Sequence, residues 1–209
     1  MKRIIYAVAL VATLIGCKST QQNADKDLVV ANLDLVNVND DKVMVSVDPG
    51  KFTTEETTFY IPKTVPGTYS TDNYGQFVED LKAIDYNGNE LKVTRIDDNS
   101  WKIDNAKELD KVTYWVNDSY DIEGEEGVFS PAGTNIAADE NFMLNLHGFV
   151  GYFKGMSEKP YQLLIKHPKD LYGGTSLKKI AVASEDGADY ETDQFNVDRY
   201  FQVTSLQML

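Results

Sequence analysis

The stretch FYIPKTVPGTYSTDNYGQFVEDLKAIDYNGNEL, residues 59–91, decides how this chain folds. Aromatic and β-branched residues favour a strand over Thr57–Ile61, which ends at Pro62 because proline cannot donate a ladder hydrogen bond. Val65-Pro66-Gly67-Thr68 fits a type II turn, since Pro fixes φ at its second position and Gly supplies a positive φ at its third. The stretch therefore begins as a strand that runs into a sharp turn.

The second half of this stretch has two interpretations. The spacing of Phe77, Leu81 and Ile84 fits a short helix, but alternation within the same run fits a strand. The Asn87-Gly88 pair is typical of a hairpin turn and favours a partner strand over Leu91–Ile96. We therefore expect the whole run to be extended and to form one half of a hairpin.

Toward the N-terminus, apolar residues recur with a period of two. Val43, Val45 and Val47 alternate with polar or flexible residues, and a similar run from Leu28 precedes the cluster Asn39-Asp40-Asp41. Alternation on both sides of a turn cluster predicts a β-hairpin with one buried face.

Toward the C-terminus, short apolar runs recur with Gly, Asn and Asp between them. The expected strands are Ser100–Ile103, Val112–Val116, Pro160–His167, a segment around Ile180 and Val182, and Phe195–Val203. Regular short strands without a long helical pattern predict an all-β fold, an antiparallel β-sandwich with immunoglobulin-like layers. We expect Trp101, Trp115 and the many Tyr and Phe side chains to fill the space between the sheets.

The N-terminus carries an export signal. Lys2 and Arg3 precede Ile4–Ile15, a run of small and apolar residues that is shorter than the ~20 residues of a membrane-spanning helix. Leu14-Ile15-Gly16-Cys17 resembles the bacterial lipobox, in which the Cys thiol takes a diacylglycerol. The alternative is an ordinary cleaved signal peptide, in which the position of Cys17, the sole Cys, would be incidental. We therefore predict lipidation at Cys17.

These features divide the chain into four parts. Residues 1–16 are expected to be a lipoprotein signal peptide, 17–27 the lipidated Cys and a flexible tether, 28–203 the β-sandwich, and 204–209 a tail. The predicted location is the bacterial cell envelope, at the outer membrane or the periplasmic face, with the membrane as a partner through Cys17. The net charge of −13 argues against nucleic acid as a partner, because phosphate binding needs a basic surface.

The sequence contains no catalytic constellation. A zinc peptidase helix needs the pattern HExxH, but His147 is followed by Gly148-Phe149-Val150-Gly151, and His167 precedes Pro168. We expect both His residues to be structural, and we expect no metal or cofactor in this chain. Three acidic loops offer oxygen ligands without EF-hand spacing, so solvated turns are favoured over calcium sites: Asp97-Asp98-Asn99, Glu123–Glu126 and Asp139-Glu140-Asn141.

Several marks in one order resemble a known family. The strand ending at Ile61, then Pro66-Gly67-Thr68-Tyr69, then Ala83-Ile84-Asp85 with Gly88, and then Trp101, are similar to the N-terminal domain of the glycyl aminopeptidase family of zinc metallopeptidases (peptidase family M sixty-one). The similarity covers roughly residues 27–201. In that family a thermolysin-like helical domain with HExxH follows, and the resemblance places zinc there.

The resemblance implies a non-catalytic β-domain and a family-specific turn at Pro66, Gly67 and Tyr69. This turn has two interpretations: a rigid corner with Tyr69 packed into the sandwich edge, which we favour, or a rim facing the catalytic cleft. Many members have arginines shortly after the turn, where this chain has Asp72 and Gln76. A ligand or interdomain role of those arginines therefore does not transfer to this chain.

Two functions are compatible with these observations. The first is the N-terminal β-domain of a membrane-anchored, glycyl-aminopeptidase-like metallopeptidase, truncated before its catalytic domain and inactive alone, with a catalytic domain or peptide substrate as partner. The alternative is a stand-alone envelope lipoprotein that binds a peptide, glycan or partner protein.

Overall fold

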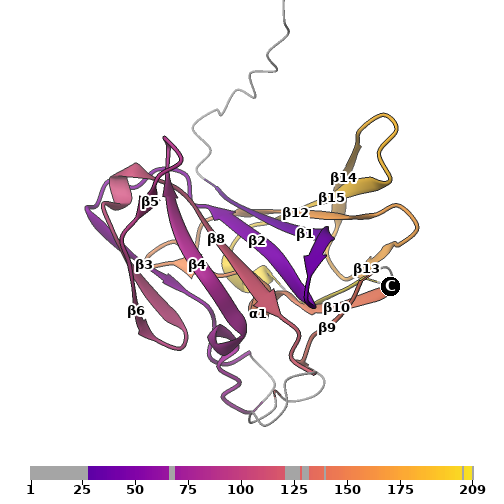
Figure 1. The fold of residues 1–209 in the computed structure, drawn as a ribbon, viewed down its shortest axis with the longest axis horizontal. Helices are drawn as coiled ribbons and strands as arrows, with labels where there is room; N and C mark the ends of the chain where they lie inside the picture. The colour runs from indigo at the N-terminus through magenta and orange to yellow at the C-terminus, as the bar shows by residue number, and fades with distance from the viewer. Residues whose placement is uncertain are drawn as a thin grey trace, which may run out of the picture.

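The computed structural model describes residues 28–65, 69–120, 128, 132–138, 140–203 and 205–208. Strands dominate these residues and form three sheets, which confirms the predicted all-β class (Figure 1). The largest sheet has eight strands in the order β14-β15-β12-β1-β2-β8-β4-β5. Their bounds are β1 (Val29–Asn39), β2 (Lys42–Asp48), β4 (Val78–Asp85), β5 (Glu90–Leu91), β8 (Leu109–Asn117), β12 (Tyr161–Pro168), β14 (Lys179–Ser184) and β15 (Tyr190–Val197).

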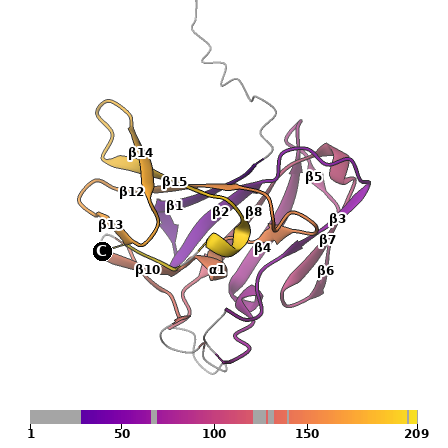
Figure 2. The ribbon, with the colours of Figure 1, turned by 180° about the vertical axis from the view of Figure 1, so that it is seen from behind.

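Two four-stranded sheets complete the fold. The order β11-β3-β7-β6 joins Tyr152–Phe153, Glu56–Tyr60, Ser100–Asp104 and Val93–Asp97, and the order β13-β16-β10-β9 joins Gly173–Thr175, Ser205–Met208, Asn141–Asn145 and Asn135–Ala137. Short helical turns connect the sheets: η1 (Tyr74–Phe77), η2 (Ala106–Glu108), α1 (Leu146–Phe149) and η4 (Tyr200–Gln202). The second sheet lies at one end of the molecule and β14 and β15 lie at the other (Figures 1 and 2).

The predicted N-terminal hairpin is confirmed. β1 and β2 pair antiparallel, and alternate residues of β2 are buried. Asp40 and Asp41 make the turn with φ of 48° and 55°. Two successive positive φ values match the right-handed twist of the flanking strands, and Asp tolerates them better than most residues other than glycine.

The predicted strand over Leu91–Ile96 is two strands. β5 pairs with β4 in the large sheet, while β6 pairs with β7 in the second sheet. Between them, the carbonyl of Lys92 accepts a hydrogen bond from the Asp104 amide at 3.1 Å. The chain thus passes from the large sheet to the second sheet at Lys92. Alternation alone does not reveal this change, because β5 and β6 have the same two-residue period.

The C-terminal predictions need correction. The expected strand Phe195–Val203 is β15, which lies earlier at Tyr190–Val197, and the helical turn η4 follows it. Residues 205–208, expected as part of a tail, form β16, which pairs with both β10 and β13. A short strand of this kind depends on partners that lie distant in the sequence, so local pattern does not identify it.

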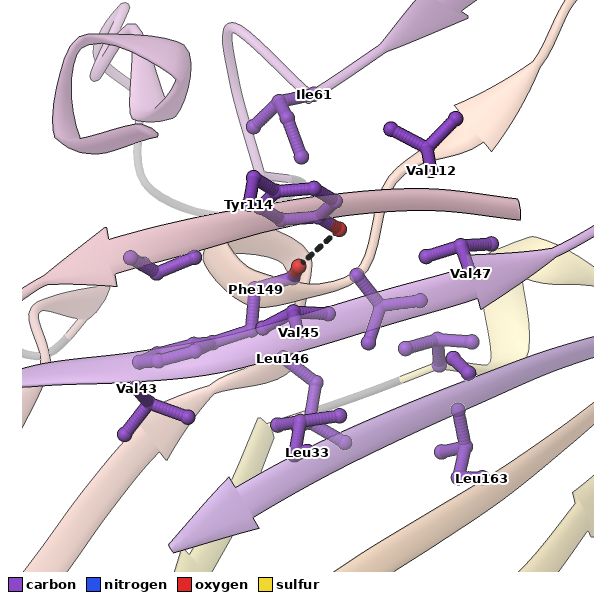
Figure 3. Close-up of a cluster of buried hydrophobic side chains, with 14 of the residues drawn as sticks. Leu33, Val43, Val45, Val47, Ile61, Val112, Tyr114, Leu146, Phe149 and Leu163 are labelled. Atoms are coloured by element: carbon purple, nitrogen blue, oxygen red, sulfur yellow. Dashed lines mark hydrogen bonds between the residues drawn. The ribbon is translucent and has the colours of Figure 1, made fainter. Parts of the chain in front are cut away.

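The core lies between the large sheet and the elements around α1. Side chains from β1, β2, β8 and β12 pack there with Leu146 and Phe149 of α1, and the Tyr114 hydroxyl donates to the Phe149 carbonyl at 2.6 Å (Figure 3). Trp101 is buried as predicted. Trp115 is only half-buried, because it points to the opposite face of β8 from Tyr114.

One strand pair is parallel. β1 and β12 run in the same direction, with Val29 opposite Tyr161 and Asp34 opposite Lys166. The other pairs in the large sheet are antiparallel, so the sheet is mixed rather than purely antiparallel. The predicted alternation in β12 is confirmed, with Tyr161, Leu163, Ile165 and His167 all buried on one face.

Candidate functional site

The loop after β3 returns to the end of that strand. The Lys63 carbonyl accepts hydrogen bonds from the amides of Asp72 and Asn73, both at 2.8 Å. Asp72 is buried, and its Oδ1 accepts from the Ser70 hydroxyl at 2.6 Å. The Gln76 amide donates to the Asp72 carbonyl at 3.0 Å. Asp72 and Gln76 therefore hold this loop in place, at positions where many relatives are expected to carry arginine.

The turn between β6 and β7 holds the other end of the loop. The Asn99 side chain is buried, accepts from the Gly75 amide at 3.0 Å, and donates to Asn73 Oδ1 at 3.1 Å. Arg95 donates to the Gly75 carbonyl at 3.1 Å. Backbone and side-chain bonds thus fix both ends of residues 63–75, which we call the pinned loop.

A shallow groove of about 280 Å³ lies beside the pinned loop. Tyr60 and Tyr152 form one wall, where their rings stack with centroids 5.3 Å apart. Lys63, Asp97 and Asn99 add polar groups. The remaining lining residues are Ile61, Pro62 and Ser100. An aromatic wall beside a few polar groups is the usual composition of a surface that contacts peptide or protein.

Tyr69 projects from the pinned loop into solvent. Its side chain is fully exposed, and its φ of 55° is unusual for an aromatic residue. The prediction that Tyr69 packs into the sandwich edge is therefore wrong. Pro66 and Gly67, the rest of the family-specific turn, lie outside the described residues.

A buried hydrogen-bond network lies on the inner side of the pinned loop. The Tyr74 hydroxyl donates to the Ala132 carbonyl at 2.9 Å, and the Asn145 amide donates to both Tyr74 Oη and the Ala132 carbonyl, at 3.1 and 2.9 Å. Burial, together with the nearby Asp72 charge, raises the pKa of Tyr74. Tyr74 therefore remains a protonated donor at neutral pH and acts as a structural group.

The two His residues occupy different environments. His147 lies on α1 with its ring edge-on to Tyr200, at a centroid distance of 5.8 Å, and burial lowers its pKa to about 4. His167 lies at the end of β12, where the strand pairing brings it to Glu191 and Asp193. Among the described residues, these three side chains are the one group of His and acidic residues close enough to hold a metal ion. No partner for His167 could be predicted from the sequence, because the partners depend on the register between β12 and β15.

The acidic loops are built into turns where the structure describes them. Asp97 Oδ1 accepts from the Asn99 amide at 2.8 Å, and Asn141 Oδ1 accepts from the Asn135 side chain at 2.8 Å. The Glu123–Glu126 loop and Asp139 lie outside the described residues. Cys17 and the predicted signal peptide also lie outside them, and no helix in the described ranges is long and apolar enough to cross a membrane.

The sequence matches the family model described as "Peptidase M61 N-terminal domain" over residues 31–205. The chain belongs to this family. The match spans the large sheet, the pinned loop and the groove, so the resemblance based on the family-specific turn is confirmed. No curated protein matches the sequence.

Two solved structures resemble this M61 N-terminal domain in fold. An aminopeptidase N family protein from Idiomarina loihiensis is similar with a TM-score of 0.69 at 17% identity, over 87% of this chain and 29% of that protein. An M1 zinc metallopeptidase from Deinococcus radiodurans matches with a TM-score of 0.47 at 10% identity, over 86% of this chain and 40% of that one. The chain thus corresponds to less than half the length of either protein.

Proposed function

We propose that this domain is the non-catalytic β-domain of a membrane-anchored, glycyl-aminopeptidase-like zinc peptidase. The family match over residues 31–205 carries this proposal, because it identifies the chain as the N-terminal rather than the catalytic part of a peptidase. The described residues also contain no HExxH helix. Under this proposal we expect the domain alone not to hydrolyse peptides.

In this proposal the pinned loop and the groove contact the catalytic domain of the peptidase. Hydrogen bonds at Lys63 and Asn99 hold residues 72–75 of the loop in place, so this segment would lose little conformational entropy when a partner docks against it. Tyr69 offers a large exposed aromatic side chain, which is a favoured interface residue.

Two measurements test this function. The purified chain, assayed with zinc against glycyl- and alanyl-anilides, is expected to give no turnover above a heat-inactivated sample; turnover would refute a non-catalytic role. The separately produced HExxH domain of a two-domain family member is expected to bind the chain in calorimetry. Tyr69→Ala should weaken this binding at least about tenfold. The control Tyr172→Ala, which removes a 67% exposed tyrosine elsewhere, should leave it unchanged.

The membrane anchor is a separate part of the proposal. Cys17→Ala should abolish incorporation of labelled fatty acid and release the protein from the membrane fraction. Unchanged labelling in the variant would refute the anchor. It would not affect the proposed role of the β-domain, which the binding experiment tests independently.

A further inference from the structure

Three chemically active side chains meet on the buried face of β12 and β15. In the large sheet, β15 and its neighbour β14 lie at the end of the molecule away from β3 and β6 (Figures 1 and 2). His167 of β12 lies opposite Glu191 of β15, and Ile165 lies opposite Asp193. Residues two apart on a strand share a face, so His167, Glu191 and Asp193 point to the same side. We call these three residues the β12–β15 cluster.

The hydrogen bond of one ring nitrogen fixes how His167 presents the other. Nδ1 lies 2.8 Å from the Pro168 carbonyl, which can only accept, so Nδ1 carries the hydrogen. Nε2 of the neutral ring then has a lone pair. This lone pair faces Asp193 Oδ2 at 3.6 Å and Glu191 Oε1 at 3.7 Å.

With the imidazole neutral, three acceptors face one another at a largely buried position, so a positive charge between them is favourable. The side chains of His167 and Asp193 are 1% and 0% exposed; His167 Nε2 makes no hydrogen bond to a described residue, whereas the Asp193 carboxylate pairs with the Lys179 ammonium. Buried polar atoms without partners destabilise a protein. The cluster therefore favours a bound cation.

Lys179 supplies only part of this charge. A register shift in β14 directs it toward Asp193, with Nζ 2.5 Å from Oδ2. Its side chain is 36% exposed on an edge strand whose residues are all exposed, so it can move into solvent. Its ion pair with Asp193 leaves Nε2 of His167 facing acceptors.

We propose that the β12–β15 cluster binds a divalent transition metal ion, with Zn²⁺ as the best fit, in competition with the Lys179 ammonium. Ligand atoms of a tetrahedral Zn²⁺ site at bond lengths of ~2.0–2.1 Å lie ~3.3–3.4 Å apart. The distances of 3.6 and 3.7 Å are close to this, and the ligand atoms all lie within 4.8 Å of one another. One imidazole and two carboxylates suit Zn²⁺ better than Ca²⁺, which prefers oxygen ligands alone.

The surroundings of His167 match those of metal-binding histidines. The Pro168 carbonyl holds the ring in the tautomer that offers Nε2, which is the usual role of a carbonyl behind a metal ligand. The metal would join β12 to β15 and leave a coordination position for water. This site is separate from the zinc that the family resemblance assigns to a catalytic domain.

The test uses the whole chain without a histidine tag, purified in detergent and freed of metal with EDTA. Titration with Zn²⁺ in a calorimeter should show one ion per chain and a raised Tm. Co²⁺ should give the visible absorption bands of a four-coordinate site. His167→Gln and Glu191→Gln should each weaken Zn²⁺ binding at least about tenfold. Glu191 is partly exposed, so its variant tests the site even if His167→Gln unfolds.

Lysine variants give a sharper readout. Lys179→Met should increase Zn²⁺ affinity, because no ammonium then competes for Asp193. The matched control is Lys102→Met, which removes a lysine of similar exposure that pairs with Glu56 at 2.6 Å. This variant should leave the Zn²⁺ affinity unchanged. His147→Gln and Cys17→Ser should also bind Zn²⁺ as the parent does. Equal affinity in the parent and His167→Gln would overturn the proposal, as would no binding by the parent or by Lys179→Met.

Discussion

The two ends of the large sheet treat buried polar groups differently. At the pinned-loop end, Asn99 is buried but bonds to Gly75 and Asn73, and Asp72 accepts from Ser70. At the β12–β15 end, His167 and Asp193 are at least as deeply buried; Asp193 pairs with the Lys179 ammonium, but His167 Nε2 makes no hydrogen bond to a described residue. Polar burial with hydrogen-bond partners builds a rigid structure, whereas polar burial without them leaves capacity to bind something else.

The largest effect should come from glycine at the pinned-loop end. In Gly75→Ala the new Cβ would lie 2.0 Å from the Asp98 carbonyl oxygen, a backbone atom that cannot rotate away. We expect the free energy of unfolding to fall by about 3–5 kcal/mol. Gly187→Ala, in the turn after β14, is the control. Its new Cβ would have no atom within 4 Å, and the substitution is unfavourable only because φ is 78°, so the free energy of unfolding should fall by about 1–2 kcal/mol. Urea unfolding measures both variants. Equal losses in the free energy of unfolding for Gly75→Ala and Gly187→Ala would contradict the prediction.

Asn99→Ala comes next in size. It leaves the Gly75 amide and the Asn73 side chain without their partner, which should cost about 2–3 kcal/mol. Asn196→Ala on β15 removes an exposed amide that only accepts from Gln162 at 3.3 Å, and should change stability by less than about 0.5 kcal/mol. Thermal unfolding distinguishes the two variants, and a small loss for Asn99→Ala would mean that the loop is not pinned there.

His147 extends the comparison to pH. Its pKa is lowered to about 4 from an ordinary 6.5, so the unfolded chain binds the proton more readily. The contribution of neutral His147 to the free energy of unfolding is therefore fully present above pH 6.5 and is lost as the pH drops toward 4. Between pH 7 and pH 5 this residue should cost about 2 kcal/mol. Urea unfolding of the parent and of His147→Gln at both pH values measures the difference, and parallel losses in the two proteins would exclude His147 as the cause.

The smallest effect should come from Asp193→Asn with metal removed by EDTA. Although Asp193 is fully buried, its attraction to Lys179 is offset by the desolvation of the carboxylate. We expect a change of less than about 1 kcal/mol in either direction. A loss above about 2 kcal/mol in urea unfolding would mean that Asp193 stabilises the fold through its ion pair, which would remove the contrast between the two ends.

Local pattern predicted much of the fold. Alternation in Val43, Val45 and Val47 predicted the hairpin. The run from Val78 to Ile84 is extended as expected, whereas Phe77 belongs to the helical turn η1. The change of sheet at Lys92 was missed, because a period of two does not identify the partner strand. The register between β12 and β15, which places Glu191 and Asp193 beside His167, was missed for the same reason.

The family-specific turn was predicted in part. Its place after β3 follows from Pro62 and the sequence behind it. The exposure of Tyr69 could not be predicted, because an aromatic residue is buried more often than exposed. In addition, one end of the loop is held by Asn99, which lies 24 residues after Gly75.

The parallel pairing of β1 with β12 affects how the protein is made. Asp34 and Lys166 are joined by a hydrogen bond across 132 residues of chain. At a synthesis rate of ~5–20 residues per second, β1 waits roughly 7–26 s for this neighbour. A central strand that depends on such a late partner raises the contact order and slows folding. The N-terminal half of the chain therefore emerges with one edge of its β1–β2 hairpin unpaired, so the large sheet closes only after most of the domain has been synthesised.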